Sequence, residues 1–167
     1  MVAASAGHGL GLCDSYQDRE ACHSEDLQMP YAATILVEYT RISLALHSTG
    51  IRAAIDLADS EIYAVVWFDL GSDERNAGAQ SYDDRVRHEV LSVLRETYQY
   101  SRPPKMVRVI MTGESADEVA VQVLIRAVVE EFASAVEMLT SHPEYVAARG
   151  AAELAWRAEK FEQANVV

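Results

Sequence analysis

Residues 142–157 read His-Pro-Glu-Tyr-Val-Ala-Ala-Arg-Gly-Ala-Ala-Glu-Leu-Ala-Trp-Arg, and this stretch is the most informative part of the chain. Proline suits the first position of a helix, because the N–H group that it lacks would be unpaired there. Pro143 therefore predicts the start of a helix that covers residues 143–162.

Gly150 lies in the middle of this predicted helix. A glycine inside a helix costs about 1 kcal/mol relative to alanine. Because small residues occupy the neighbouring faces, we expect that glycine is used here to let another backbone come close. The residues of this expected contact surface are Ala147, Gly150, Ala151 and Ala155.

Short β-rich runs come before this helix. Residues 34–37 form the first run, and Ile42, Leu44 and Leu46 alternate with smaller or polar residues in the second, which predicts two strands with a tight connection near Thr40 and Arg41. Further strands are predicted over residues 61–68, 106–111 and 136–139. The chain is therefore expected to contain a mixed five-stranded sheet.

Helices are predicted between the later strands. After a loop over residues 69–80, Ser81 is interpreted as the N-cap of a helix that Pro103 and Pro104 end. A second helix is predicted over residues 116–133, with Ser115 and Asp117 as caps. The order β-β-β-α-β-α-β-α predicts an α/β fold, with residues 31–167 as one domain.

The N-terminal segment, residues 1–30, is predicted to be irregular, with a short helix from Asp14 or Ser15 to about Gln28. His8, Cys13, Cys22 and His23 raise the question of a zinc site, but their spacing matches none of the common patterns. We therefore expect no metal. The first ten residues lack the basic start and apolar stretch of a signal peptide.

The composition excludes several classes of partner. The chain has 167 residues, half of them hydrophobic, and a net charge of -12. Nucleic acids and anionic membrane surfaces both attract basic proteins, so we expect neither as a partner. No apolar run approaches the roughly 18 residues of a membrane-spanning helix. An intracellular, cytoplasmic location is therefore expected.

The pattern Pro-Glu-x-x-Ala-Ala-x-Gly-Ala-Ala in residues 143–152 resembles the C-terminal hinge helix of heat-shock chaperones and actin-like ATPases. More narrowly, the chain is similar to fungal proteins with an actin-like ATPase domain, and the similarity covers most of its length. The resemblance implies the second lobe of a ribonuclease-H-like ATPase, with helices packed on a mixed sheet. It also implies that the first lobe, which the length leaves no room for, would carry the helix that crosses Gly150.

In that family the first hairpin of the lobe holds phosphate through backbone N–H groups at its turn. The resemblance places this turn at Glu38, Tyr39, Thr40 and Arg41. Glu38 replaces the family's aspartate, its glycines are absent, and Tyr39 and Arg41 add bulk. Both a plain β-hairpin and a weakened phosphate site remain open.

The family's adenosine-binding turn corresponds to Gly113, Glu114 and Ser115. Only one of its two glycines is present, since Thr112 replaces the other. The subdomain that would form the other wall of an adenine pocket does not fit between Trp67 and Met111. We therefore expect neither a cofactor nor useful ATP hydrolysis, with binding of ATP or ADP and Mg²⁺ as the alternative.

A remote alternative is a serine esterase. Residues 113–116 resemble the nucleophile elbow that follows a strand in α/β-hydrolases. Ser115 would be the nucleophile, His142 the base and Glu137 the orienting acid, although Asp117 stands where the elbow needs glycine.

The function that the sequence favours is a non-catalytic or degenerate lobe. It would act as a protein-interaction module, or as part of a larger two-lobe protein. In the first case the small-residue surface around Gly150 would recruit a protein partner or a second copy of the chain. Trp67, Phe68 and Trp156 are interpreted as core or interface residues.

Overall fold

The structure is a computed structural model that describes residues 2–8, 31–48, 62–101 and 106–164. Its centre is a five-stranded mixed sheet in the order β3-β2-β1-β4-β5. The strands are β1 (Tyr31–Val37), β2 (Ile42–Ser48), β3 (Ile62–Phe68), β4 (Met106–Thr112) and β5 (Glu137–Leu139). β2 is antiparallel to its neighbours β1 and β3, whereas β4 runs parallel to both β1 and β5. The predicted α/β fold with a mixed five-stranded sheet is confirmed.

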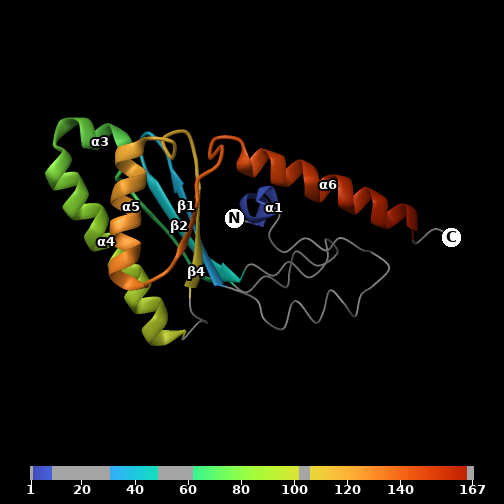
Figure 1. Ribbon diagram of the computed structural model, residues 1–167, viewed down its shortest axis with the longest axis horizontal. Helices are drawn as coiled ribbons and strands as arrows, with labels where there is room; N and C mark the ends of the chain where they lie inside the picture. The colour runs from blue at the N-terminus through green and yellow to red at the C-terminus, as the bar shows by residue number, and fades with distance from the viewer. Residues whose placement is uncertain (1, 9–30, 49–61, 102–105, 165–167) are drawn as a thin grey trace.

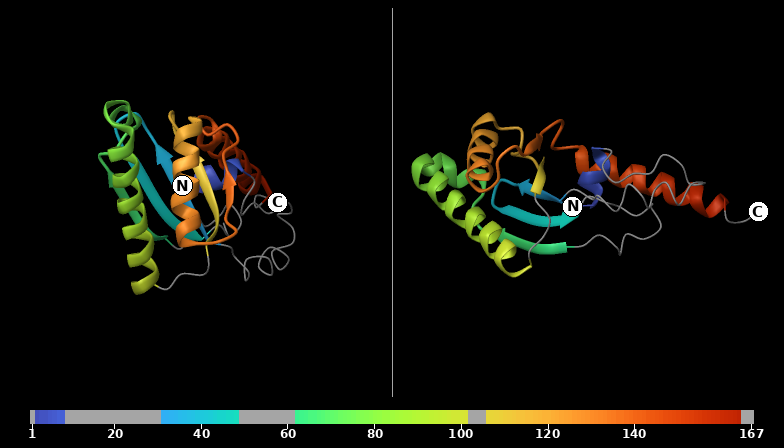
Figure 2. Two further views of the ribbon diagram at one scale, coloured as in Figure 1. Left: turned by 60° about the vertical axis from the view of Figure 1, so that its left-hand side comes forward. Right: turned by 60° about the horizontal axis from the view of Figure 1, so that its bottom comes forward.

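Helices lie on both faces of this sheet (Figures 1 and 2). α3 (Ser72–Ala77), α4 (Ala79–Tyr100) and α5 (Val119–Phe132) lie on one side. α1 (Val2–Gly7) and α6 (Val146–Ala164) lie together on the other side, next to β4. α6 extends well beyond the end of the sheet.

The main core lies between the sheet and α4 and α5. Alternate strand residues point into it, such as Ile35, Leu44 and Val109, because successive side chains of a strand face opposite sides. Val86, Val90, Leu91 and Leu94 form an apolar stripe on α4 and are buried there. A smaller cluster on the opposite face joins Ala4 of α1, Ile110 of β4 and Val146 of α6.

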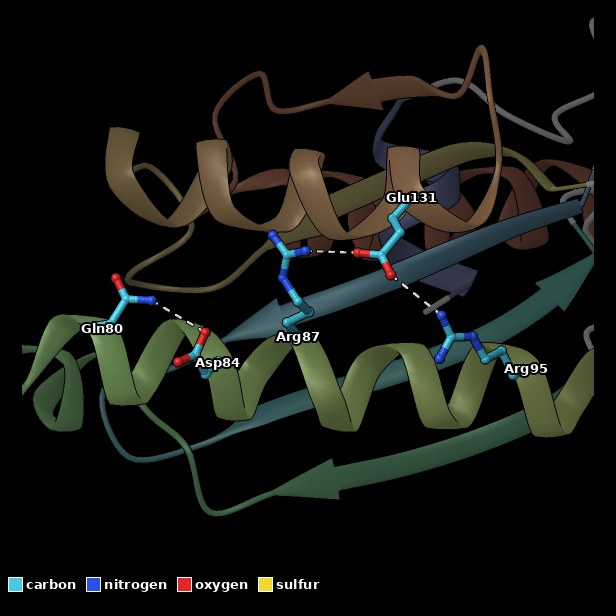
Figure 3. A network of polar contacts seen from close by, with 5 residues as sticks. All are labelled: Gln80, Asp84, Arg87, Arg95 and Glu131. Carbon is cyan, nitrogen blue, oxygen red and sulfur yellow. Dashed lines mark hydrogen bonds and ion pairs between the residues drawn. The ribbon is translucent and has the colours of Figure 1, made fainter.

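Polar contacts join α4 and α5 at the surface (Figure 3). Glu131 of α5 accepts hydrogen bonds from Arg87 at 2.8 Å and from Arg95 at 3.4 Å, both on α4. Exposed ion pairs of this kind contribute less than about 1 kcal/mol each. The two helices therefore depend mainly on their buried apolar residues.

Helix starts differ from the sequence predictions. The predicted loop over residues 69–80 contains α3, and α4 begins at Ala79, since the N–H of Tyr82 bonds to the carbonyl of Gly78 at 3.0 Å. Ser81 is thus inside the helix. The N-cap of α5 is Glu118, which makes no side-chain cap bond, so the caps predicted at Ser115 and Asp117 are wrong.

α6 begins at Val146, three residues later than Pro143 predicts. His142 has a positive φ of 50°, and its carbonyl accepts the N–H groups of Tyr145 and Val146. The carbonyl of Pro143 bonds away from the helix, to the N–H of Gly113 at 3.2 Å and the hydroxyl of Thr112 at 3.0 Å. These bonds hold Pro143 in a turn.

The N-terminal segment also differs, because residues 2–7 form α1 where an irregular segment is predicted. The short helix predicted between residues 14 and 28 lies outside the described residues, and so do Cys13, Cys22 and His23.

Candidate functional site

The two turns that the sequence analysis singled out lie side by side. Because β1 and β4 are parallel neighbours, with Leu36 beside Thr112, their carboxyl ends meet at one edge of the sheet. The N–H of Ser115 bonds to the carbonyl of Val37 at 3.1 Å. The N–H of Tyr39 bonds to Oε1 of Glu114 at 2.8 Å. The structure thus joins residues 38–41 and 113–115 in one site, which we call the turn junction.

Gly113 allows this close approach. Its φ is +109°, a conformation that side chains with a β-carbon rarely adopt. A β-carbon there would also stand 2.9 Å from Cδ1 of Leu36 and would overlap the carbonyl of Val37. The turn after β4 can therefore lie against β1 only if this residue is glycine.

A third segment, which the sequence analysis left in a loop, completes the turn junction. The N–H groups of Ser72 and Asp73, at the start of α3, bond to the carbonyls of Glu38 and Tyr39 at 3.2 and 3.1 Å. The hydroxyl oxygens of Ser72 and Ser115 lie 2.8 Å apart and are buried. A β-carbon on Gly71 would overlap the backbone of Tyr39. The Gly71-Ser72 pair shortly after β3 was the available sequence signal.

The charges at the turn junction are mainly negative. Glu38 and Arg41 form an ion pair at 3.1 Å, with side chains 39% and 54% exposed. Glu114 adds a second carboxylate, and its hydrogen bond to Tyr39 is solvent-exposed. Among the described residues of the junction, Arg41 is the single cation, and it already faces Glu38. The site therefore offers an incoming anion little favourable charge.

The esterase alternative requires Ser115, His142 and Glu137 to come together. Ser115 is 5% exposed and bonds to Ser72 instead. Glu137 forms an ion pair with Arg108 at 2.9 Å, near the start of β4, whereas Ser115 follows the end of that strand. His142 lies in the exposed turn before α6. The structure does not assemble these three residues into a triad.

The predicted contact surface around Gly150 meets α1 of the same chain. A β-carbon on Gly150 would lie 2.5 Å from the backbone nitrogen of Gly7 and would overlap the carbonyl of Ala3. The guanidinium of Arg149 donates a hydrogen bond to the carbonyl of Gly7. The expected close backbone is confirmed. Without a first lobe, Gly150 was expected to be exposed and free to recruit a partner. This expectation is wrong, because α1 covers Gly150. Ala151 and Ala155 are exposed, and Ala147 is half-buried.

His8 makes this helix crossing sensitive to pH. Burial lowers the pKa of His8 from its ordinary value of 6.5, and Arg149 lowers it further, while Glu137 opposes the shift. The ring atom Nε2 is buried and has no hydrogen-bond partner among the described residues. Protonation would therefore place a second positive charge beside Arg149, at a partly buried position that the more weakly acting Glu137 does not offset.

We expect acidification to destabilise the chain through His8. Below pH 6.5 the unfolded chain takes up a proton that the folded chain resists, so this contribution is complete above pH 6.5 and is lost as the pH falls through the folded pKa. Urea unfolding at about pH 7.5 and about pH 5.5 should show a larger loss for the wild type than for His8→Gln, which does not titrate. An equal loss in both proteins would contradict this role.

In the described parts of the chain, no group of histidine, cysteine, aspartate or glutamate side chains is arranged to bind a metal ion. None of the described helices is long and apolar enough to cross a membrane. No family model matches the chain, and no curated protein sequence matches it.

Proposed function

We propose that this chain is a single ribonuclease-H-like lobe of the kind found in actin-like and chaperone ATPases. In this proposal it does not hydrolyse ATP, and it acts as a protein-interaction module or as part of a larger two-lobe protein. The strand order β3-β2-β1-β4-β5, with β2 antiparallel to its neighbours and β4 and β5 parallel to β1, supports such a lobe. The crossing of α1 and α6 at Gly150 agrees with the hinge-helix pattern.

The hydrogen bond from the Tyr39 N–H to Glu114 is the observation that carries the proposal. A phosphate-holding hairpin needs free backbone N–H groups at its turn, with small residues around them. At this turn the Tyr39 N–H is already bonded to a carboxylate of the same chain. A phosphate that used this donor would have to displace the Glu114 carboxylate, whose negative charge also repels an anion.

Other backbone groups of the turn junction are also occupied by hydrogen bonds within the chain. The N–H of Glu38 closes the hairpin by bonding to the carbonyl of Arg41 at 2.9 Å. The Ser72 and Asp73 N–H groups at the start of α3 bond to hairpin carbonyls. The N–H groups of Glu38 and Tyr39 and the carbonyls of the hairpin turn named above thus have partners within the chain, which favours a structural junction over a nucleotide site.

A calorimetric titration of the wild-type chain with ATP and with ADP, in the presence of Mg²⁺, tests this function. We expect no binding up to about 1 mM ligand. A dissociation constant of about 1 mM corresponds to a binding free energy of only about 4 kcal/mol. Phosphate release from ATP should not exceed the background rate. Micromolar binding, or turnover that Glu38→Ala abolishes, would contradict the proposal and would favour the nucleotide-binding alternative.

The two forms of the proposed role predict different behaviour in solution. The interaction module is favoured by large apolar side chains that are exposed, such as Tyr145 just before α6 and Trp156 on α6, because exposed apolar surface is available to a partner. If the chain is instead part of a two-lobe protein, adding a separately produced first lobe should restore nucleotide binding. Sedimentation of the chain alone and of this mixture distinguishes the two.

A further inference from the structure

β3 is an edge strand, and the described residues give it none of the usual protection of sheet edges. It lies at one end of the strand order, and no described element lies beyond it in Figures 2 and 3. Its residues Ile62–Phe68 read Ile-Tyr-Ala-Val-Val-Trp-Phe, without a charge or a proline. Natural proteins usually protect such edges with lysine, proline or a covering element, because the unpaired backbone groups can pair with another chain.

Three large apolar side chains of β3 are exposed on one face of the sheet. Val65 pairs with Ala45 and Trp67 with Ser43 on β2. A register shift between Leu46 and His47 places Ile62 opposite His47, which is on the same face as Ala45. A regular strand would have turned Ile62 to the other face, because side chains alternate. The exposed fractions are 53% for Ile62, 53% for Val65 and 67% for Trp67.

The opposite face of β3 is already used by the fold. Ala64, Val66 and Phe68 pack against the main core. The strand is therefore held in place from within, while no described element covers its outer edge, and Ile62, Val65 and Trp67 are exposed on its second face. An added strand would gain backbone hydrogen bonds from the edge and side-chain contacts with Ile62, Val65 and Trp67.

The negative charge of the chain favours a basic partner segment at this edge over a second copy of the chain. Asp69 follows β3 directly, is exposed, and has no ion pair within the described ranges. Each copy of the chain carries a net charge of -12, so pairing two copies edge to edge would bring two acidic molecules together. A segment with basic residues next to its apolar run would instead be attracted.

We propose that β3 binds an extended segment of a partner protein, in which apolar residues alternate and lysine or arginine flanks the apolar run. The segment adds a strand beside β3 and places its apolar side chains on the strip formed by Ile62, Val65 and Trp67. This inference extends the interaction role proposed above, but it rests on β3 alone. Its failure would leave the nucleotide titration unaffected.

Fluorescence anisotropy with labelled peptides tests the inference on the full chain. The probe is a ten-residue peptide that alternates valine and threonine and has two lysines at each end. One control peptide has glutamates at the ends, and another has a central proline, which cannot donate a backbone hydrogen bond. We expect the lysine peptide to bind about tenfold or more tightly than either control, and added salt to weaken it.

Matched variants locate the binding surface. Val65→Lys adds a charge to the exposed strip, and Val123→Lys makes the same change at a residue of α5 that is 61% exposed. We expect Val65→Lys to lower the affinity for the lysine peptide about tenfold or more, and Val123→Lys to change this affinity less than about twofold. Trp67→Thr keeps a strand-forming residue and should also weaken binding, so the test survives if Val65→Lys fails to fold.

Three results would overturn the inference. The first is no binding of the lysine peptide up to about 1 mM. The second is equal binding of the proline peptide, which would indicate non-specific apolar adhesion rather than strand addition. The third is a dimer, seen by sedimentation, that Val65→Lys converts to a monomer, since a second copy would then occupy the edge.

Discussion

Replacing Gly150 by alanine is expected to destabilise the chain by about 2 kcal/mol, although the same change in an isolated helix would stabilise it by about 1 kcal/mol. The sign reverses because a β-carbon at this position would overlap the carbonyl of Ala3 and press on the nitrogen of Gly7. These are backbone atoms, so no change of side-chain rotamer can relieve the overlap. α1 would have to move away from α6.

Urea unfolding and amide hydrogen exchange measure this effect. Gly150→Ala should lower the free energy of unfolding and speed exchange within α1. Ala151→Gly is the matched control, because Ala151 is exposed on the same helix. It should cost about 1 kcal/mol through helix propensity and leave exchange in α1 unchanged. A more stable Gly150→Ala protein would show that the two helices do not pack as described.

Gly113→Ala is expected to have the largest effect of the substitutions considered, a loss of about 3 to 4 kcal/mol in the free energy of unfolding. Two costs act together. The φ of +109° is unfavourable for alanine, and the new methyl group would overlap the carbonyl of Val37. Relief of the overlap would separate the turn after β4 from β1, which would also break the bond between the Ser115 N–H and Val37.

Gly78→Ala provides the control for Gly113→Ala. Gly78 is extended, with a φ of −178°, and a β-carbon there would meet no atom within 4 Å. As the N-cap of α4 it should lose about 1 kcal/mol or less. In thermal or urea unfolding, the loss in the free energy of unfolding should therefore be severalfold larger for Gly113→Ala than for Gly78→Ala. Similar losses in both would mean that the turn junction is not tightly packed.

Strand positions could be predicted well because they depend on local alternation. Ile42, Leu44 and Leu46 alternate with residues of the other face, and the structure buries all three in the main core. The family resemblance pointed to both turns, but as two separate sites, one for phosphate and one for adenosine. Their contact depends on β1 and β4 being parallel neighbours, which is a property of the whole sheet.

The elements that were missed depend on tertiary contacts. An isolated helix of fewer than about 12 residues is marginal in water, so α1, with six residues, gains its stability from α6. α3 likewise begins where Ser72 and Asp73 bond to the hairpin. Residues 2–7 carry no local pattern that predicts these contacts, and for α3 the Gly71-Ser72 pair was the one local signal. The hydrogen bond between Tyr39 and Glu114 spans 75 positions and is equally non-local.

The crossing of α1 and α6 changes the expectation about partners. The sequence analysis assigned the partner helix of Gly150 to a separate lobe, but the chain supplies its own. The exposed apolar residues that remain are elsewhere, with Trp67 on β3 and Trp156 further along α6. The exposed apolar surface available to a partner therefore lies at the edge of the sheet, not at Gly150.

The most direct test of the proposed function is an amide NMR spectrum, recorded while ATP and Mg²⁺ are added. The Tyr39 resonance reports the hydrogen bond to Glu114, so it should differ between the wild type and Glu114→Ala before any ligand is added. We predict that in the wild type the Tyr39 and Gly113 resonances stay in place up to about 5 mM ATP. A saturable shift of both at micromolar ATP would contradict the account, because it would place a nucleotide at the turn junction.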